Sequence, residues 1–267
     1  MRQTLKGLVL VLGVFAMSFA TAVPASADPD DQWKNGELGP ATFTPEERKL
    51  AALELARSER VAGTLRPRTT GADGEIGIAS CCTIYETVSV PTDEQEQDTW
   101  CGPATIKVML LTPRIDQYNE QSALATEMGT DSGGTYVYKM REALNDHTIY
   151  DPAIAPQMPA NWFWLEYQVA DVSDFVARHR EDLGESLPTV FNVKGESNDG
   201  NYSLVGWSSN GWHYVTGHGY REGDLVLDVQ YTDSYQDPVT LASLGAHWFD
   251  AYPMYILVRD NKSYIVY

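Results

Sequence analysis

The chain has 267 residues, with 37 acidic and 19 basic side chains, a formal net charge of -18 and only three cysteines. These numbers exclude a disulfide-stapled miniprotein, a collagen and a disordered acidic tail. They also argue against a nucleic-acid partner, because an acidic surface repels phosphate backbones. The length suits one domain of catalytic size and a shorter N-terminal segment.

The first residues have the organisation of a secretory signal peptide. Arg2 and Lys6 precede an apolar run at residues 7–20, and small residues follow up to Ala27. We expect cleavage after Ala27, so residues 1–27 are interpreted as a signal peptide. The run is shorter than the about 20 apolar residues that a spanning helix needs. The sequence therefore predicts a secreted, extracellular protein without a membrane anchor.

Residues 28–79 are interpreted as a leader that contains one helix. Thr44-Pro45-Glu46-Glu47 matches a capping box with proline at the first helical position, and the helix is expected to continue to about Arg60. Residues 63–77 are rich in Gly, Thr, Arg and Pro and indicate a linker. The helix is either a pro-segment that covers a groove of the main domain or a solvated leader.

The main domain is expected to span residues 80–267, with helices first and an antiparallel sheet second, which is an α+β layout. Apolar residues at helical spacing predict the helices, and β-rich runs between turn residues predict the strands. The predicted helices lie at residues 101–111, 119–128, 137–144 and 172–180. The predicted strands lie at residues 85–90, 189–193, 202–207, 213–220, 225–231, 255–258 and 264–267.

Cys101 is the first candidate for catalysis. A thiol is a nucleophile only as its thiolate, which the helix dipole and the unpaired N–H groups at the start of a helix favour. Gly102 is expected to allow close approach of a substrate backbone. Gln95, six positions before the cysteine, suits an oxyanion hole shared with the Cys101 backbone N–H, and Gln97 is the competing candidate. A buried cysteine that only packs is the alternative interpretation.

Two histidines on a downstream strand are candidates for the base. His213 and His218 are five residues apart, and an odd separation on a strand places side chains on opposite faces. Only one of them is therefore expected to address the cysteine. Asp228 follows on the next strand, where it is expected to accept a hydrogen bond from His213 and fix its tautomer. The alternative is a satisfied core histidine and an ordinary strand-end carboxylate.

Three stretches of the chain together resemble a known family: Gln95 with Trp100-Cys101-Gly102-Pro103-Ala104, Met128-Gly129-Thr130 with Gly133-Gly134-Thr135, and His213-Tyr214-Val215 with Gly219-Tyr220. They are similar to those of secreted bacterial papain-like cysteine peptidases, related to the domains that trim double-glycine leaders from bacteriocins. The resemblance covers residues 80–267. It implies a two-lobe papain-like fold, with Cys101 on a helical lobe and His213 and Asp228 on a sheet lobe.

The same resemblance implies the roles of the candidate residues. Cys101 would be the nucleophile, His213 the general base and then acid, Asp228 the orienting group and Gln95 an oxyanion donor. The family often has an Asp-Pro pair at the third position, where this sequence has Asp228-Val229. The expected reaction is hydrolysis of peptide bonds through an acyl-enzyme. A related acyl transferase or amidase, or an inactive peptide- or cell-wall-binding module of the same fold, is the alternative.

The remaining cysteines and the histidines bear on redox state and cofactors. Cys81 and Cys82 are adjacent, and they are two thiols, a vicinal disulfide, or a cap on Cys101 that would make a redox-latent enzyme. The five histidines share no ligand spacing, so we expect no metal and no cofactor. The expected partner is a peptide or protein substrate, and the acidic surface favours a basic one. The sequence leaves the oligomeric state open.

Overall fold

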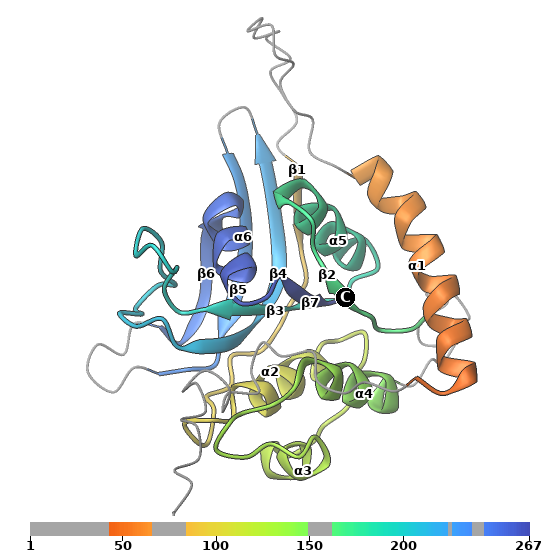
Figure 1. Cartoon of the computed structure of the whole chain (residues 1–267), viewed down its shortest axis with the longest axis horizontal. Coiled ribbons are helices and arrows are strands. Elements are labelled where there is room, and N and C mark those ends of the chain that lie inside the picture. Colours follow the sequence, from red (N-terminus) through yellow and green to blue (C-terminus); the bar gives the residue numbers. More distant parts are fainter. Residues whose placement is uncertain (1–42, 66–83, 149–161, 224–225, 237–242) are drawn as a thin grey trace, which may run out of the picture.

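The computed structural model describes residues 43–65, 84–148, 162–223, 226–236 and 243–267 (Figure 1). The predicted signal peptide and the Cys81-Cys82 pair lie outside these ranges, so the interpretations that rest on them stay predictions. Within the described ranges, no helix has both the length and the apolar character needed to cross a membrane.

The described elements form one antiparallel sheet and the helices around it. The helices are α1 (Pro45–Leu65), α2 (Cys101–Leu110), α3 (Gln121–Glu127), α4 (Val137–His147), α5 (Val172–Gly184) and α6 (Ala251–Asp260). The strands are β1 (Ile84–Thr87), β2 (Glu166–Gln168), β3 (Thr189–Lys194), β4 (Trp212–Gly223), β5 (Val226–Asp233), β6 (Gly245–Asp250) and β7 (Tyr264–Val266). The strand order is β2-β7-β3-β4-β5-β6. The strand β1 pairs with the part of β4 that extends past the first residue of β3.

The central strands separate two cores, because their alternate side chains enter different ones. Phe191 of β3 and Val215 of β4 join the core that includes residues of α5 and α6. Their neighbours Val190 and Tyr214 join the core that includes residues of α2 and α4. In Figure 1, α2, α3 and α4 lie together on one side of the sheet, while α5 and α6 pack against it elsewhere. The expected α+β layout is confirmed.

The predicted helices and most predicted strands are confirmed, but two strands are wrong. Residues 202–207 form turns, in which Gly206 has a φ of 80°, a left-handed conformation that interrupts a strand. Residues 255–258 belong to α6. This helix forms because Met254, Leu257 and Val258 recur at helical spacing and are buried in the core, which outweighs the strand preference of single β-branched residues.

The N-terminal helix α1 has the predicted start and continues past the predicted end, to Leu65. The capping box forms, since the Thr44 N–H donates to Glu47 Oε2 at 2.7 Å and the Glu47 N–H donates to Thr44 Oγ1 at 3.3 Å. The helix packs along α5 (Figure 1) and buries Glu54, Ser58 and Ala62. A solvated leader is therefore the wrong description of this helix.

Arg178 of α5 holds the two helices together. Its guanidinium pairs with Glu59 of α1 at 2.5 Å and with Asp174 of its own helix at 3.4 Å, and it donates to the Ser58 hydroxyl. The planar group also lies over the Tyr167 ring, 4.4 Å from the centroid. Since the side chain is only 1% exposed, the interface depends on this one charge being fully partnered.

We expect Arg178→Met to lower the free energy of unfolding by about 3 kcal/mol, because buried Asp174 and Ser58 lose a charged donor. The matched control is Arg259→Met, which removes an arginine that is 48% exposed and pairs with Asp260. That change should stay within about 0.5 kcal/mol. Urea unfolding followed by tryptophan fluorescence measures both, and equal effects would show that the α1–α5 contact contributes little.

Candidate active site

A cavity of about 580 Å³ lies between the helical part and the sheet. Gln95, Asp98 and Cys101 line it from the start of α2 and the loop before it. The other wall consists of residues from the sheet and its loops, namely Lys194, Trp207, Asn210, Gly211, Trp212, His213, Tyr235 and Gln236. The cavity thus brings together three of the four predicted site residues: Cys101, His213 and Gln95.

Cys101 is the first residue of α2, as predicted, and is 3% exposed. Every residue of this helix is buried, so the core fixes the direction in which its N-terminus points. Gly102 has a packing role inside the protein, because a Cβ there would lie 2.5 Å from Thr135 Oγ1. The glycine therefore lets Thr135 pack against the start of the helix.

His213 is the base candidate that the fold brings to Cys101. Its Nε2 donates to Asp233 Oδ1 at 2.7 Å, and the Cys101 side chain is its other hydrogen-bond partner. Burial disfavours the charged imidazole, but the Asp233 carboxylate and then Cys101 outweigh it and raise the pKa of His213 to about 10. The imidazole is therefore charged at neutral pH, and Nδ1 is the nitrogen left to exchange a proton with the thiol.

The predicted hydrogen bond between Asp228 and His213 does not form, and Asp233 takes this place. Asp228 lies directly across the β4–β5 pair from Arg221, whose Nε donates to its Oδ2 at 2.7 Å. Beyond a register shift between Gly217 and Gly219, Thr216 pairs with Thr232. His213 precedes Thr216 on β4, and the two strands are antiparallel. The residues beside His213 therefore come after Thr232 in the chain. Counting outward from the gap between the predicted strands 213–220 and 225–231 would have favoured Asp233 over Asp228.

Trp207 and Tyr235 hold Asp233 and were missed in the sequence. The Trp207 indole N–H donates to Asp233 Oδ2 at 2.8 Å, and the Tyr235 backbone N–H donates to Oδ1 at 2.8 Å. The Trp207 ring centroid also lies 4.6 Å from that of His213. A Cβ on Gly195 would collide with the Trp207 ring, so this glycine makes room for it. Placing Trp207 in a predicted strand concealed its role.

Gln95 lies in the cavity, but its amide faces the loop before α2. Nε2 donates to the carbonyl oxygens of Gln97 and Asp98 at 3.0 and 3.1 Å, and its backbone N–H donates to Ser234 O at 2.8 Å. Its Oε1 is buried and has no hydrogen-bond partner. Gln97 is exposed and does not line the cavity. The geometry therefore favours Gln95 over Gln97 as the oxyanion candidate.

His218 is held away from the cavity, so only one of the two histidines addresses Cys101. Its Nδ1 contacts Val88 O at 3.1 Å and its Nε2 contacts Thr232 Oγ1 at 3.0 Å. Burial lowers the pKa of His218, which favours the neutral ring. Across the described ranges, no cluster of three or more His, Cys, Asp or Glu residues could hold a metal ion.

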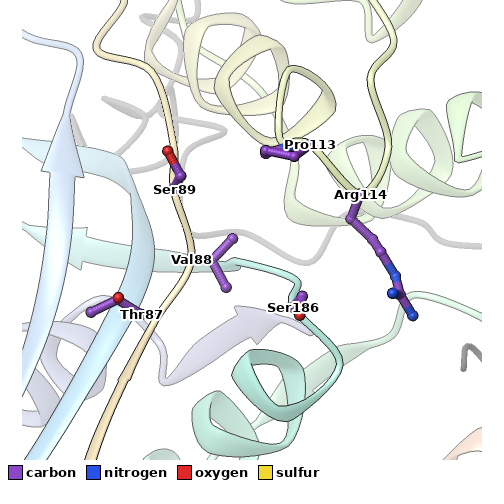
Figure 2. Close-up of a pocket in the computed structure, with 6 residues that line it drawn as sticks. All are labelled: Thr87, Val88, Ser89, Pro113, Arg114 and Ser186. Atoms are coloured by element: carbon purple, nitrogen blue, oxygen red, sulfur yellow. The ribbon is translucent and has the colours of Figure 1, made fainter.

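A second cavity, of about 350 Å³, lies apart from Cys101 (Figure 2). Figure 2 shows side chains from three segments around it: the end of β1 with the two residues after it, the loop after α2, and the loop after α5. The lining residues are Thr87, Val88, Ser89, Pro113, Arg114 and Ser186. They include no thiol and no imidazole, so the first cavity is the candidate active site.

The helix α1 does not cover the candidate active site. The described residues that line the cavity come from the α2 side and from the sheet with its loops, and none comes from α1. The helix lies instead along α5 (Figure 1). Residues 45–65 therefore do not line this cavity, and their interpretation as a pro-segment stays a prediction.

Comparison with known proteins gives a family match over most of the described domain. The model of the Peptidase_C39 like family matches residues 87–248. No curated protein matches the chain. With that match, the helical part that carries Cys101 and the antiparallel sheet that carries His213 confirm the predicted α+β, papain-like fold.

Several solved structures of cysteine proteases are similar to this chain. Bromelain protease from Ananas comosus with a bound inhibitor has 13% identity and a TM-score of 0.44, covering 68% of this chain and 93% of that one. The proform of the ragweed pollen allergen Amb a 11 has 10% identity and a TM-score of 0.44, covering 89% and 90%. A recombinant stem bromelain precursor has 11% identity and a TM-score of 0.42, covering 67% and 66%.

The pKa of His213 gives a test of the site that does not depend on turnover. Folding raises this pKa from 6.5 to about 10, so the imidazolium stabilises the fold fully below pH 6.5. This contribution is lost as the pH rises through about 10. We expect histidine NMR titration to find one ring with a pKa near 10.

Asp233→Asn should lower the pKa of His213 to below about 7, because burial then outweighs the remaining interactions. The matched control is Asp228→Asn, which removes a carboxylate from the same strand that pairs with Arg221. That variant should leave the pKa of His213 unchanged. An effect of Asp228→Asn as large as that of Asp233→Asn would contradict the assignment.

Proposed function

Because the chain belongs to the Peptidase_C39 like family, we propose that it hydrolyses peptide bonds with Cys101, His213 and Asp233. One observation carries the proposal: His213 bridges the Cys101 side chain and the Asp233 carboxylate at the wall of one cavity. The thiol lies at the start of a buried helix. This arrangement has the parts that acyl transfer through a thiol requires.

The reaction takes two steps that return the site to its starting state. The Cys101 thiolate, paired with the His213 imidazolium, attacks the carbonyl carbon of the substrate. The C–N bond breaks, His213 donates the proton to the leaving amine, and the acyl group remains on sulfur. Water then gives a proton to His213 and its oxygen to the acyl carbon. The C–S bond breaks, a carboxylic acid leaves and gives its proton to solvent, and the thiolate and imidazolium remain.

The start of α2 and Gln95 are the candidates to stabilise the oxyanion. A helix directs its first N–H groups and the positive end of its dipole outward at this point, which favours negative charge beside Cys101. Gln95 must exchange one of its bonds to the carbonyls of Gln97 and Asp98 for the oxyanion. We therefore propose that its amide turns toward the substrate when the tetrahedral intermediate forms.

We also propose that the protein is exported and acts on extracellular peptides or proteins. The support is the basic, apolar and small-residue pattern of residues 1–27. Expression of the full chain should release a protein that begins at Asp28, as N-terminal sequencing would show. A chain that retains Met1 would contradict cleavage after Ala27.

Cys101→Ala and His213→Ala should each lower kcat/KM on a cleaved peptide by at least about 1000-fold. Iodoacetamide should alkylate Cys101 at pH 6 at least about tenfold faster than in His213→Ala, because the wild-type imidazolium stabilises the thiolate. Peptide mapping of the adduct measures the second effect. Fast alkylation without hydrolysis would favour acyl transfer to another acceptor, and slow alkylation without hydrolysis would favour the binding module.

Trp207→Phe should lower kcat about tenfold and change KM less than about twofold, because Asp233 loses its indole donor while an aromatic ring is kept beside His213. The matched control is Trp248→Phe on β6, beneath Arg221, which should leave both constants unchanged. Steady-state kinetics on one fluorogenic peptide compares them. An equal loss in the control variant would attribute the effect to general destabilisation.

A further inference from the structure

Lys194 is a cation in the candidate active site that has no carboxylate partner among the described residues. Three other lysines pair with carboxylates, at 3.9 Å for Lys49, 3.0 Å for Lys107 and 2.8 Å for Lys139. The neighbour of Lys194 is instead the Trp212 ring, whose centroid is 5.5 Å from Nζ. In a chain with a net charge of -18, an unpaired ammonium at the wall of the cavity leaves one strong donor unused by the fold.

Lys194 and the catalytic histidine both line the sheet wall of the cavity. Lys194 ends β3 and pairs with Trp212 at the start of β4, and the next pair along the strands is Val193 with His213. The backbone ladder continues past this point, because the Gly195 N–H donates to Gly211 O at 2.7 Å. Lys194 therefore has a fixed backbone and a half-buried side chain, which reduces the ordering cost of binding an anion.

The charges of the cavity are divided between its two walls. Asp98 is the carboxylate of the α2 wall, whereas Lys194 belongs to the sheet wall. Asp233 is fully buried and accepts from His213, Trp207 and the Tyr235 N–H, so it is not available to neutralise Lys194. An anionic group of a bound peptide would thus meet its favourable contact on the sheet side.

We propose that Lys194, backed by the Trp212 ring, binds a carboxylate of the peptide substrate beside the scissile bond. This inference rests on the proposed function and adds a substrate class to it. The carboxylate belongs either to an Asp or Glu side chain or to a C-terminus. The net acidity of the molecule favours basic substrates at long range, but salt screens that field beyond about 8 Å. The contact at Lys194 is short-range and acts after encounter.

The hydrolytic test compares isosteric peptides. A peptide cleaved by the wild-type protein, identified by mass spectrometry of a digested peptide library, is remade with Glu or Gln at each position around the cut. Further versions carry a free or an amidated C-terminus. One carboxylate should raise kcat/KM about five- to tenfold over its amide. The position at which it does so distinguishes a side-chain carboxylate from a terminal one.

Lys194→Gln should reduce this preference to less than about twofold, and Lys194→Glu should reverse it in favour of lysine. The matched control is Lys139→Gln, which removes the same charge from α4, where it pairs with Glu142. That variant should retain both the preference and the activity. A preference that persists in Lys194→Gln, or its absence from the wild type, would overturn the inference.

A binding test separates this inference from the proposed function. Cys101→Ala protein is titrated with fluorescein-labelled polyalanine pentapeptides that carry Glu or Gln at each position, and anisotropy gives Kd. The Glu form should bind about fivefold more tightly at one position, and adding Lys194→Gln should abolish the difference. If no peptide is hydrolysed, the proposed function fails and this difference still decides the subsite. Equal Kd values for all Glu and Gln forms, and for forms with a free or an amidated C-terminus, would overturn it.

Discussion

The hydrogen bond between His213 and Asp233 is the interaction on which the rest of the site depends. Burial alone would leave the imidazole neutral, and the carboxylate reverses this by raising the pKa of His213 to about 10. Asp233 is itself buried, so it needs donors of its own, which Trp207 and Tyr235 supply. The charged pair is therefore stable in the interior only because the loop that carries Trp207 closes over it.

The loop between β3 and β4, which carries Trp207, determines where these two strands end and begin. β3 stops at Lys194, and Gly195 leaves space for the Trp207 ring where a side chain would collide with it. The chain then turns through Gly206 and returns as β4, which starts immediately before His213. One irregular segment between two neighbouring strands thus delivers both the donor for Asp233 and the strand that carries the imidazole.

Local patterns predicted the parts of the molecule that depend on local interactions. The capping box at Thr44 and the buried periodicity after Cys101 are short-range signals, and both helices form. The prediction of Asp228 takes no account of the register of the β4–β5 pair, which shifts between Gly217 and Gly219. Residues 255–258 form a helix and not the predicted strand because their burial against the sheet is a tertiary effect. The prediction of the site residues was therefore limited by long-range strand pairing more than by the chemistry of single residues.

Basic side chains that form ion pairs inside the fold explain why the surface is acidic while the cavity contains the ammonium of Lys194. With 19 basic against 37 acidic side chains, each carboxylate that pairs with an arginine inside the fold uses one of the few basic side chains. Arg57 and Arg178 are committed to Glu181, Glu59 and Asp174 at the α1–α5 contact. The surface that remains is strongly acidic, and it repels anions. We therefore expect Lys194, which has no carboxylate partner in the described part of the chain, to affect anion binding in the cavity more than it would on a neutral protein.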